Sequence, residues 1–322
     1  MAKHRKPRGA AMSPTMTMPV HKPVLTNEVI EALHLLPGKR YIDCTLGGGG
    51  HAEAILPNIQ PDGQLLGIDA DPEAIYITKG RLAAHVQNLI LVNDNFLNLE
   101  SICRQHDFLP VHGILFDLGL SSIQLDDATR GFSFQKSGPL DMRFDPTQQF
   151  AASDVVNTFS EEKLAEIIKE YGEERFYKRI ARNIVNNRPI SNTRELANAI
   201  ADVTGGYRAK IHPATRTFMA LRIYINHELE NISAALRQAV NCLDREGRLV
   251  VISYHSLEDR VVKQFMLRES KGCICPPSIP VCQCGHEASL KIITRKVVTP
   301  SREETKSNPR SRSAKLRVAE RL

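Results

Sequence analysis

The chain has 322 residues, 42% of them hydrophobic, and a formal net charge of +6. This size supports a substantial core and more than one folding unit, and no apolar run approaches the roughly 20 residues of a membrane-spanning helix. The first twenty residues lack the hydrophobic centre of a secretory signal. We therefore expect a cytoplasmic globular protein. An organellar transit segment is the alternative, because residues 1–27 hold five basic and no acidic residues.

The first predicted strand, at Tyr41 and Ile42, leads into four consecutive glycines. The stretch that follows it reads Asp-Cys-Thr-Leu-Gly-Gly-Gly-Gly-His over residues 43–51, and a helix-like segment comes next. Glycines have no side chain to bury, but they let the backbone turn tightly and let a ligand approach the main chain. A strand, a glycine loop and a helix in this order are typical of the first crossover of a doubly wound sheet that binds nucleotides.

Two further predicted strands end in polar residues. The first covers residues 65–68 and is followed by Asp69, where an acid hydrogen-bonds ribose hydroxyls in Rossmann-type sheets. Asp71 and Pro72 then suit the N-cap and first turn of a helix. The second strand, residues 89–92, precedes Asn95 and Phe96. An amide beside an aromatic ring suits adenine recognition, although Phe96 taken alone is typical of a core residue.

A fourth apolar run, Val111–Asp117, also ends in an acid. Asp117 is expected at the carboxyl end of a central strand, in the crevice where open sheets bind ligands. Ser121 and Ser122 follow closely and offer further hydrogen-bond acceptors.

The pattern then changes to helical spacing and returns to a sheet pattern at residues 247–253. We expect Ser160 and Thr193 to cap helices, Gly205-Gly206 to end one, and Pro213 to begin another. An edge strand is predicted at 292–298. The fold class is therefore α/β, a Rossmann-like sheet with an inserted all-helical domain. The expected parts are a basic tail at 1–20, a first sheet part at 21–122, a helical insert at 123–225 and a second sheet part at 226–322.

The glycine loop fits two cofactors. Gly47, Gly49 and Ala52 match G-x-G-x-x-A, and Asp69 follows about twenty residues on, as in dinucleotide-binding sheets. S-adenosylmethionine is favoured over NAD because a carboxylate at Asp43 would repel a pyrophosphate but could hold a cationic amino group. His51 also stands where a helix amide would meet phosphate. A glycine-rich connector without a ligand is the remaining alternative.

Longer motifs make the chain resemble a known family. They are D-x-T-x-G-x-G-G-H, G-I-D-x-D-P, D-L-G-x-S-S-x-Q-L-D, G-P-L-D-M-R, Y-G-E-E-R, H-P-A-T-R-T-F, S-Y-H-S-L-E-D-R and N-P-R-S-R-S-A-K-L-R, spread over about His21 to Arg321. The set resembles the ribosomal RNA small subunit methyltransferase H family, also called MraW. That resemblance implies a class I S-adenosylmethionine-dependent methyltransferase that modifies the exocyclic N4 of a cytosine in the decoding region of 16S ribosomal RNA.

The resemblance also implies a set of cofactor-binding positions, to which we add Asp43 for the amino group of the donor. For catalysis, Asp117 with Ser121 and Ser122 could accept a hydrogen bond from the amine that is methylated. His255 and Ser256 are candidates for substrate contact, and residues 141–143 for a gate or an RNA contact. The [DNS]-P-P-[FYW] motif of many amino-methyltransferases is absent at Asp117, so no base-stacking partner is predicted. The implied cofactor positions are Gly49, Gly50, His51, Asp69, Phe96, Asp117 and Gln124.

Positive charge and cysteines are unevenly placed. Residues 295–322 hold nine basic and three acidic residues, which favours contact with an RNA backbone. Arg175, Lys178, Arg179 and Arg182 recur at helical spacing and could face RNA or solvent. Residues 273–284 read C-x-C-x6-C-x-C, which in a cytosolic chain suggests zinc rather than disulfides. Because C-x-x-C is the commoner spacing, a redox-sensitive loop and inert thiols stay open, and no metal ligand is assigned.

Two other functions remain open from the residues alone. An NAD(P)-dependent oxidoreductase would use the same glycine loop, and a non-catalytic ribosome-assembly factor would bind RNA through the basic end without turnover. Binding of NAD(P) in place of S-adenosylmethionine would indicate the oxidoreductase. An Asp117→Ala protein that keeps its full biological effect would indicate the assembly factor.

Overall fold

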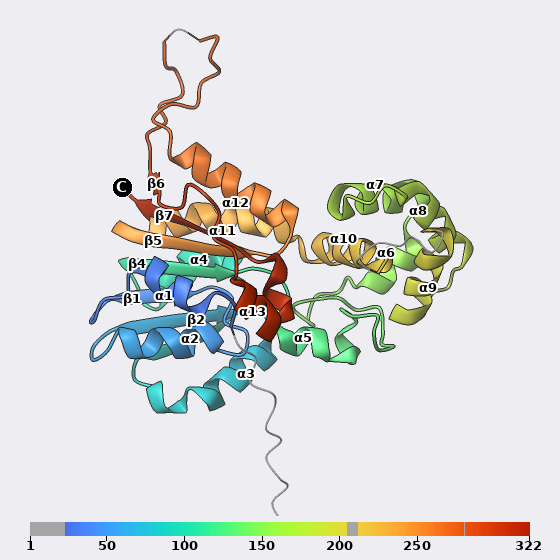
Figure 1. Cartoon of the computed structure of the whole chain (residues 1–322), viewed down its shortest axis with the longest axis horizontal. Coiled ribbons are helices and arrows are strands. Elements are labelled where there is room, and N and C mark those ends of the chain that lie inside the picture. The colour runs from blue at the N-terminus through green and yellow to red at the C-terminus, as the bar shows by residue number, and fades with distance from the viewer. Residues whose placement is uncertain (1–22, 205–211, 280) are drawn as a thin grey trace, which may run out of the picture.

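The computed structural model describes residues 23–204, 212–279 and 281–322, and in them seven strands form one sheet (Figure 1). The strand order is β3-β2-β1-β4-β5-β7-β6, and β7 runs antiparallel to the other six strands. The order reverses between β1 and β4, so the crevice at their carboxyl ends is the expected ligand position. The strands are β1 (Arg40–Asp43), β2 (Gln64–Asp69), β3 (Leu89–Asn93), β4 (Val111–Asp117), β5 (Leu243–Ser253), β6 (Leu290–Ile292) and β7 (Lys315–Arg321).

Helices cover both faces of the sheet because successive strand side chains point to opposite sides. On β4, Ile114 and Phe116 enter one core with helices α4, α11 and α12, whereas Leu115 enters the other with α1 and α2. The helices of these layers are α1 (Thr26–Leu33), α2 (Gly50–Ile55), α3 (Pro72–Arg81), α4 (Leu99–Gln105), α11 (Glu228–Cys242), α12 (Ser256–Glu269) and α13 (Arg302–Ser307). Short 3₁₀ turns are η1 (Leu56–Asn58), η2 (Ala83–His85), η3 (Phe96–Asn98), η4 (Ala128–Arg130) and η5 (Pro309–Ser313).

The chain between β4 and β5 builds a second, helical lobe, which Figure 1 shows beside the sheet. Its apolar side chains, from Phe132 to Ile225, form a hydrophobic cluster separate from the two sheet cores. The predicted fold class, a Rossmann-like α/β sheet with a helical insert, is thus confirmed. The helices are α5 (Ser122–Asp126), α6 (Ala152–Thr158), α7 (Glu161–Gly172), α8 (Tyr177–Asn186), α9 (Thr193–Thr204) and α10 (Ala214–Asn226). None of the described helices is long and apolar enough to cross a bilayer.

Two predicted helix caps are confirmed and one is wrong. Asp71 and Ser160 accept hydrogen bonds from the backbone N–H groups of Glu73 and Lys163, at 3.1 and 3.2 Å. At the start of α9, however, Asn192 Oδ1 accepts the bond from Glu195 N at 3.0 Å. Thr193 instead turns its hydroxyl to the carbonyl oxygen of Lys136, at 3.1 Å. The predicted stop at Gly205-Gly206 lies outside the described residues.

The edge strand predicted at residues 292–298 is mostly wrong. Strand β6 ends at Ile292, and beyond it only Val298 forms an isolated bridge to β7. The N–H groups of Ile293 and Thr294 both donate to the carbonyl oxygen of Val318, at 3.0 and 3.2 Å. Because two successive donors share one acceptor, the regular ladder cannot continue.

Candidate cofactor and acceptor site

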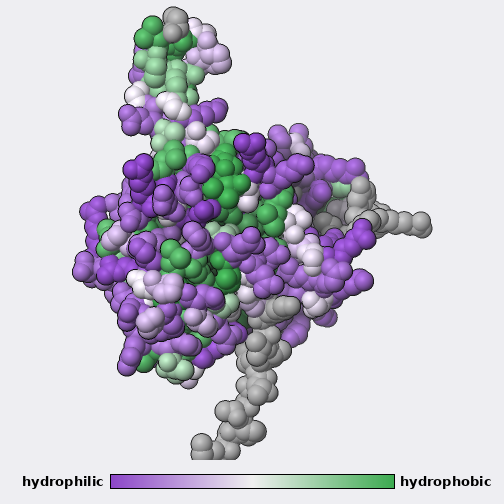
Figure 2. Space-filling model, turned by 60° about the vertical axis from the view of Figure 1, so that its left-hand side comes forward, coloured by the Kyte–Doolittle hydropathy of each residue, from purple (hydrophilic) through white to green (hydrophobic). Residues whose placement is uncertain are grey.

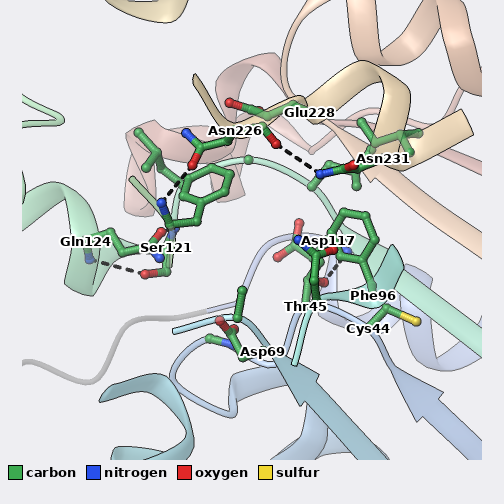
Figure 3. Close-up of a pocket in the computed structure, with 18 of the residues that line it drawn as sticks. Cys44, Thr45, Asp69, Phe96, Asp117, Ser121, Gln124, Asn226, Glu228 and Asn231 are labelled. Carbon is green, nitrogen blue, oxygen red and sulfur yellow. Dashed lines mark hydrogen bonds between the residues drawn. The ribbon is translucent and has the colours of Figure 1, made fainter. Parts of the chain in front are cut away.

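One pocket lies over the carboxyl ends of the parallel strands and beneath the helical lobe (Figure 3). The sheet side contributes residues that follow β1, β2, β3 and β4, and the lobe contributes a loop and the junction of α10 with α11. Of the predicted site residues, Asp69, Phe96, Asp117, Ser121 and Gln124 border this pocket. Other bordering residues are Cys44, Thr45, Gly47, Asn95, Phe144, Asp145, Gln148, Asn226, Glu228, Asn231 and Glu258.

Asp69 links the glycine loop to the end of β2. Its Oδ2 accepts the N–H of Gly47 at 2.7 Å, and its Oδ1 accepts the N–H of Asp71 at 2.9 Å. Burial raises the pKa of Asp69 to about 6, against the lowering effect of these two bonds. Each oxygen keeps a second lone pair, so the carboxylate can still accept from a ligand hydroxyl.

The middle of the glycine loop packs against α3. Gly49 has a φ of +75°, and a Cβ added there would lie 2.8 Å from Thr78 Cγ2. Thr78 Oγ1 donates to the carbonyl oxygen of Gly47 at 3.0 Å, and Arg81 donates to that of Gly48 at 2.8 Å. Within the described part of the chain, Gly49 and Gly50 do not border the pocket. The structure thus shows close packing and backbone geometry at Gly49, and the predicted cofactor contact of Gly49 and Gly50 stays a prediction.

Asp117, at the end of β4, is the centre of a charged network. Tyr254 donates its hydroxyl to Oδ1 at 2.8 Å, and His51 Nε2 lies 3.4 Å from Oδ2. The backbone N–H of Asp117 donates to Thr45 Oγ1 at 2.6 Å. Burial raises the pKa of the Tyr254 hydroxyl well above its usual range, and the Asp117 carboxylate raises it further. Tyr254 is therefore a fixed hydrogen-bond donor that holds the carboxylate in place.

Asp43 and His51 are not among the described residues that border the pocket, although each contacts a residue that does. Asp43 is fully buried, and its Oδ1 accepts the N–H of Thr45 at 3.1 Å, while Oδ2 has no hydrogen-bond partner within the described structure. Burial raises the pKa of Asp43 to about 6. Burial lowers the pKa of His51, but Asp117 and Asp43 more than offset this, so the pKa is raised overall. The two carboxylates thus favour the protonated form of the His51 imidazole, which lies 3.4 Å from Asp117.

Gln124 and Ser121 bind each other at the start of α5. Ser121 Oγ accepts the N–H of Gln124 at 3.2 Å, and Gln124 Oε1 accepts the N–H of Ser121 at 3.2 Å, which forms a capping box. Gln124 Nε2 also donates to Asp71 Oδ2 at 3.1 Å, where Arg130 joins at 2.6 Å. This network fixes the loop after β4 against the loop after β2. The side chain of Ser122 lies outside the described part of the structure.

His255 and Ser256 lie at the start of α12, where His255 contacts Glu258 of the same helix and Ser256 bonds to the lobe. His255 Nδ1 accepts the N–H of Glu258, and its Nε2 lies 3.0 Å from Glu258 Oε1. Ser256 donates to Glu173 Oε2, at the end of α7, at 2.6 Å. Neither is among the described residues that border the pocket; Glu258, which does border it, is fully buried. Their predicted contact with substrate stays a prediction.

Sequence reasoning gave no role to two groups of residues in and around the site. Tyr254 follows β5, a parallel neighbour of β4, so the strand-end rule that located Asp117 also places Tyr254 at the crevice, but it does not give the bond between the two side chains. Glu228 borders the pocket and is paired bidentately with Arg222, at 2.7 and 2.9 Å. No sequence signal places this pair, because it depends on how the lobe returns to the sheet.

The predicted gate at residues 141–143 is held internally. Asp141 pairs with Arg143 at 2.7 Å, and Met142 is buried in the lobe. The pairing with Arg143 lowers the pKa of Asp141 despite its partial burial, which acts in the other direction. The residues just beyond, Phe144 and Asp145, reach the pocket.

The donor set fits an adenosine-containing cofactor. An acid follows β2, an amide and the half-buried ring of Phe96 follow β3, and a second acid follows β4. The Phe96 ring is held edge-on against Phe116, with centroids 5.7 Å apart. Together with a sheet that is parallel except for the antiparallel strand β7, these features define a class I methyltransferase.

Comparison with known proteins identifies the family. The model of the MraW methylase family matches residues 18–322. Ribosomal RNA small subunit methyltransferase H of Dehalococcoides mccartyi (strain 195) is 57% identical over 95% of this chain and 88% of that protein. The protein of the same name from Thermomicrobium roseum is 52% identical, over 94% of each chain. Among solved structures, a putative rRNA methylase from Clostridium thermocellum matches with a TM-score of 0.45 and 12% identity, over 94% of this chain and 100% of that one.

The chain belongs to the MraW methylase family. S-adenosylmethionine is therefore its methyl donor, and the oxidoreductase hypothesis is set aside. Asp69, Asn95 and Phe96 all border the pocket.

Proposed function

We propose that this chain methylates the exocyclic N4 of a cytosine in the decoding region of 16S ribosomal RNA, in the cytoplasm. The RNA substrate is inferred from the names of the relatives, ribosomal RNA small subunit methyltransferase H. The base and the atom are inferred from the motif resemblance. The observation that carries the chemistry is the Asp117 carboxylate, which borders the pocket and is fixed by Tyr254 at 2.8 Å.

S-adenosylmethionine supplies an electrophilic methyl group when bound. The exocyclic amine of cytosine is a poor nucleophile because its lone pair is delocalised into the ring. Asp117 can accept a hydrogen bond from that amine and take up its proton as positive charge develops. The side chain is 22% exposed, enough to be reached from the pocket, and His51 lies beneath it at 3.4 Å. A base in this position must be unstacked or single-stranded.

We further propose that the helical insert recognises the RNA. Arg175, Lys178 and Arg179 of the predicted basic set are exposed on or next to α8, and the guanidinium groups of both arginines lie over the ring of Phe176, at 4.7 and 5.7 Å. Exposed cations beside aromatic rings suit both phosphate contact and base stacking. Arg182 instead pairs with Glu161 at 3.2 Å.

The basic C-terminal segment is less available for RNA than its charge indicates. Arg317 and Lys315 lie on β7 and both pair with Asp259, at 2.6 and 3.2 Å. Arg310 pairs with Asp126 at 2.6 Å. These three charges are matched within the protein, whereas Arg302, Lys306 and Arg312 of the same segment are exposed. We therefore propose both α8 and this segment as RNA contacts.

The direct test uses methyl-labelled S-adenosylmethionine and small ribosomal subunits from a strain that lacks this gene. The RNA is digested to nucleosides, and label is expected in N4-methylcytidine. Asp117→Ala should abolish the label, whereas Asp62→Asn, at an exposed turn, should not change it. Label in another nucleoside would keep the methyltransferase and refute the cytosine. Binding of cofactor and RNA without label would indicate an assembly factor.

A further inference from the structure

A long loop between α12 and β6 projects away from the sheet (Figures 1 and 2). It covers residues 270–289, and its described part contains no helix or strand. Its base is closed by Ser289, which donates its N–H to the carbonyl oxygen of Glu269 and its hydroxyl to Glu269 Oε2, both at 2.8 Å. Val281, in the projecting part, is 70% exposed. No hydrophobic core therefore holds the outer part of the loop.

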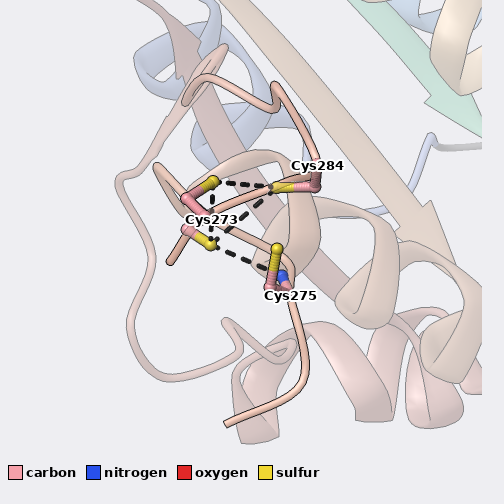
Figure 4. Close-up of side chains that lie close together, drawn as sticks. Cys273, Cys275 and Cys284 are labelled. Carbon is pink, nitrogen blue, oxygen red and sulfur yellow. Dashed lines mark hydrogen bonds between the residues drawn. The ribbon is translucent and has the colours of Figure 1, made fainter. Parts of the chain in front are cut away.

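Four cysteines gather in that outer part (Figure 4). Their Sγ atoms all lie within 4.8 Å of one another. The Sγ atom of Cys282 is 3.5 Å from those of Cys273 and Cys284, and the Cys273 and Cys284 sulfurs are 3.8 Å apart. The fourth member of the cluster is Cys275. Three of these thiols are exposed to solvent and all four are free. Hydrophobic burial thus cannot explain why they converge.

The spacing fits one tetrahedral ion better than disulfides. A disulfide needs sulfurs about 2.05 Å apart, and the observed separations are 3.5 to 3.8 Å. Four thiolates at about 2.3 Å from one zinc ion are separated by roughly 3.8 Å along each edge of the tetrahedron. Tetrahedral sets of four soft sulfur ligands select zinc or iron.

The backbone around the cluster is arranged to stabilise thiolates. The N–H groups of Ile274, Cys275 and Gln283 donate to the sulfurs of Cys284, Cys273 and Cys275, at 3.4, 3.4 and 3.3 Å. Such bonds offset the negative charge that four thiolates bring to one site. His286 is not a member of the cluster, because its Nε2 contacts the carbonyl oxygen of Arg268 at 3.1 Å.

We propose that Cys273, Cys275, Cys282 and Cys284 bind one zinc ion that folds the projecting loop. Four protein ligands fill the tetrahedron and leave no open position, so the site is structural and not catalytic. Binding converts the four thiols to thiolates and releases their protons to solvent. The site is independent of the methyl-transfer pocket, since none of the four cysteines borders it.

The test measures metal in the full chain, purified under reducing conditions from zinc-supplemented cells. Elemental mass spectrometry should find about one zinc ion per chain. The variants Cys282→Ser and Cys273→Ser should contain roughly one tenth or less of the wild-type amount of zinc. His286→Ala, in the same loop, should retain the wild-type amount. Cobalt(II) added to the metal-free protein should give the visible bands of a tetrahedral tetrathiolate complex, and Cys275→Ser should change them.

Binding of S-adenosylmethionine by each variant shows that the sheet remains folded. Unchanged zinc content in Cys282→Ser would refute the proposal, as would wild-type protein that contains no metal and gives no cobalt spectrum. If the purified protein contains iron in place of zinc, the proposed ion is wrong and the proposed set of four ligands is right. Disulfides between these cysteines in the protein isolated from cells would refute the metal site in favour of a redox-sensitive loop.

Discussion

Replacing Gly49 by alanine tests how the glycine loop is held. The φ of +75° disfavours an alanine by about 1–2 kcal/mol. The new Cβ would also lie 2.8 Å from Thr78 Cγ2, so Thr78 must move. That movement puts its 3.0 Å bond to the Gly47 carbonyl at risk, worth about 1 kcal/mol. We expect a total destabilisation of about 2–4 kcal/mol, with weaker cofactor binding because Gly47 N also binds Asp69.

The chain supplies two matched controls. Gly38 has a φ of +73° but nothing within 4 Å of an added Cβ, so Gly38→Ala should show the backbone strain alone. Gly80 lies within α3, at a φ outside the left-handed region and with open space around it, so alanine there should stabilise by about 0.5–1 kcal/mol. Urea unfolding gives the three free energies, and calorimetric titration with S-adenosylmethionine gives the binding constants.

Equal destabilisation by Gly49→Ala and Gly38→Ala would refute the packing of the loop on Thr78. A double-mutant cycle sharpens the result. Thr78→Ala should cost stability in the wild type, where it removes a hydrogen bond, and cost less in the Gly49→Ala protein, where it relieves the clash.

Three further outcomes are expected. Tyr254→Phe removes the hydroxyl that fixes Asp117 at 2.8 Å. Single-turnover methylation should therefore slow by about tenfold or more, while the affinity for the cofactor stays constant. An unchanged rate would show that Tyr254 does not position Asp117. Burial raises the pKa of Asp43 from 3.8 to about 6. The protonated carboxyl therefore contributes its full stability below about pH 4, and this contribution is lost as the pH rises through about 6. Over that interval the urea midpoint of Asp43→Asn should fall less than the midpoint of the wild type. Arg222→Met leaves the buried carboxylate of Glu228 without its ion-pair partner, whereas Glu258 keeps His255. The loss should destabilise the protein by about 3–5 kcal/mol, which urea unfolding would measure.

The sequence predicted well those site residues that lie at the carboxyl ends of parallel strands. Asp69, Phe96 and Asp117 each follow a predicted parallel strand, and all three border one pocket because such strands share a carboxyl edge. The position of a residue after a strand is less informative for Asp43 and His51. It predicts which edge of the sheet a residue lies at, but not whether its side chain is buried or faces the pocket. Both side chains are buried and neither borders the pocket, so their contact with the cofactor stays a prediction.

The lobe side of the site could not be predicted in the same way. Phe144, Asn226 and Glu228 reach the pocket through the tertiary packing of the insert, and helical periodicity shows only which face of each helix is buried. Likewise, the spacing of the four clustered cysteines left metal binding, a redox-sensitive loop and inert thiols open, and only the convergence of their sulfurs favours one ion.

The pocket wall belongs to two lobes that are tied together by Glu173, at the end of α7, through its bonds to Ser256 and Arg260 at the start of α12. If two ligands each favour the same arrangement of the lobes, binding of one raises the affinity for the other. Thermodynamic reciprocity fixes the size of the effect: whatever factor cofactor contributes to RNA affinity, RNA contributes to cofactor affinity. Substitution of Glu173 would change that coupling without removing a single residue from the pocket wall.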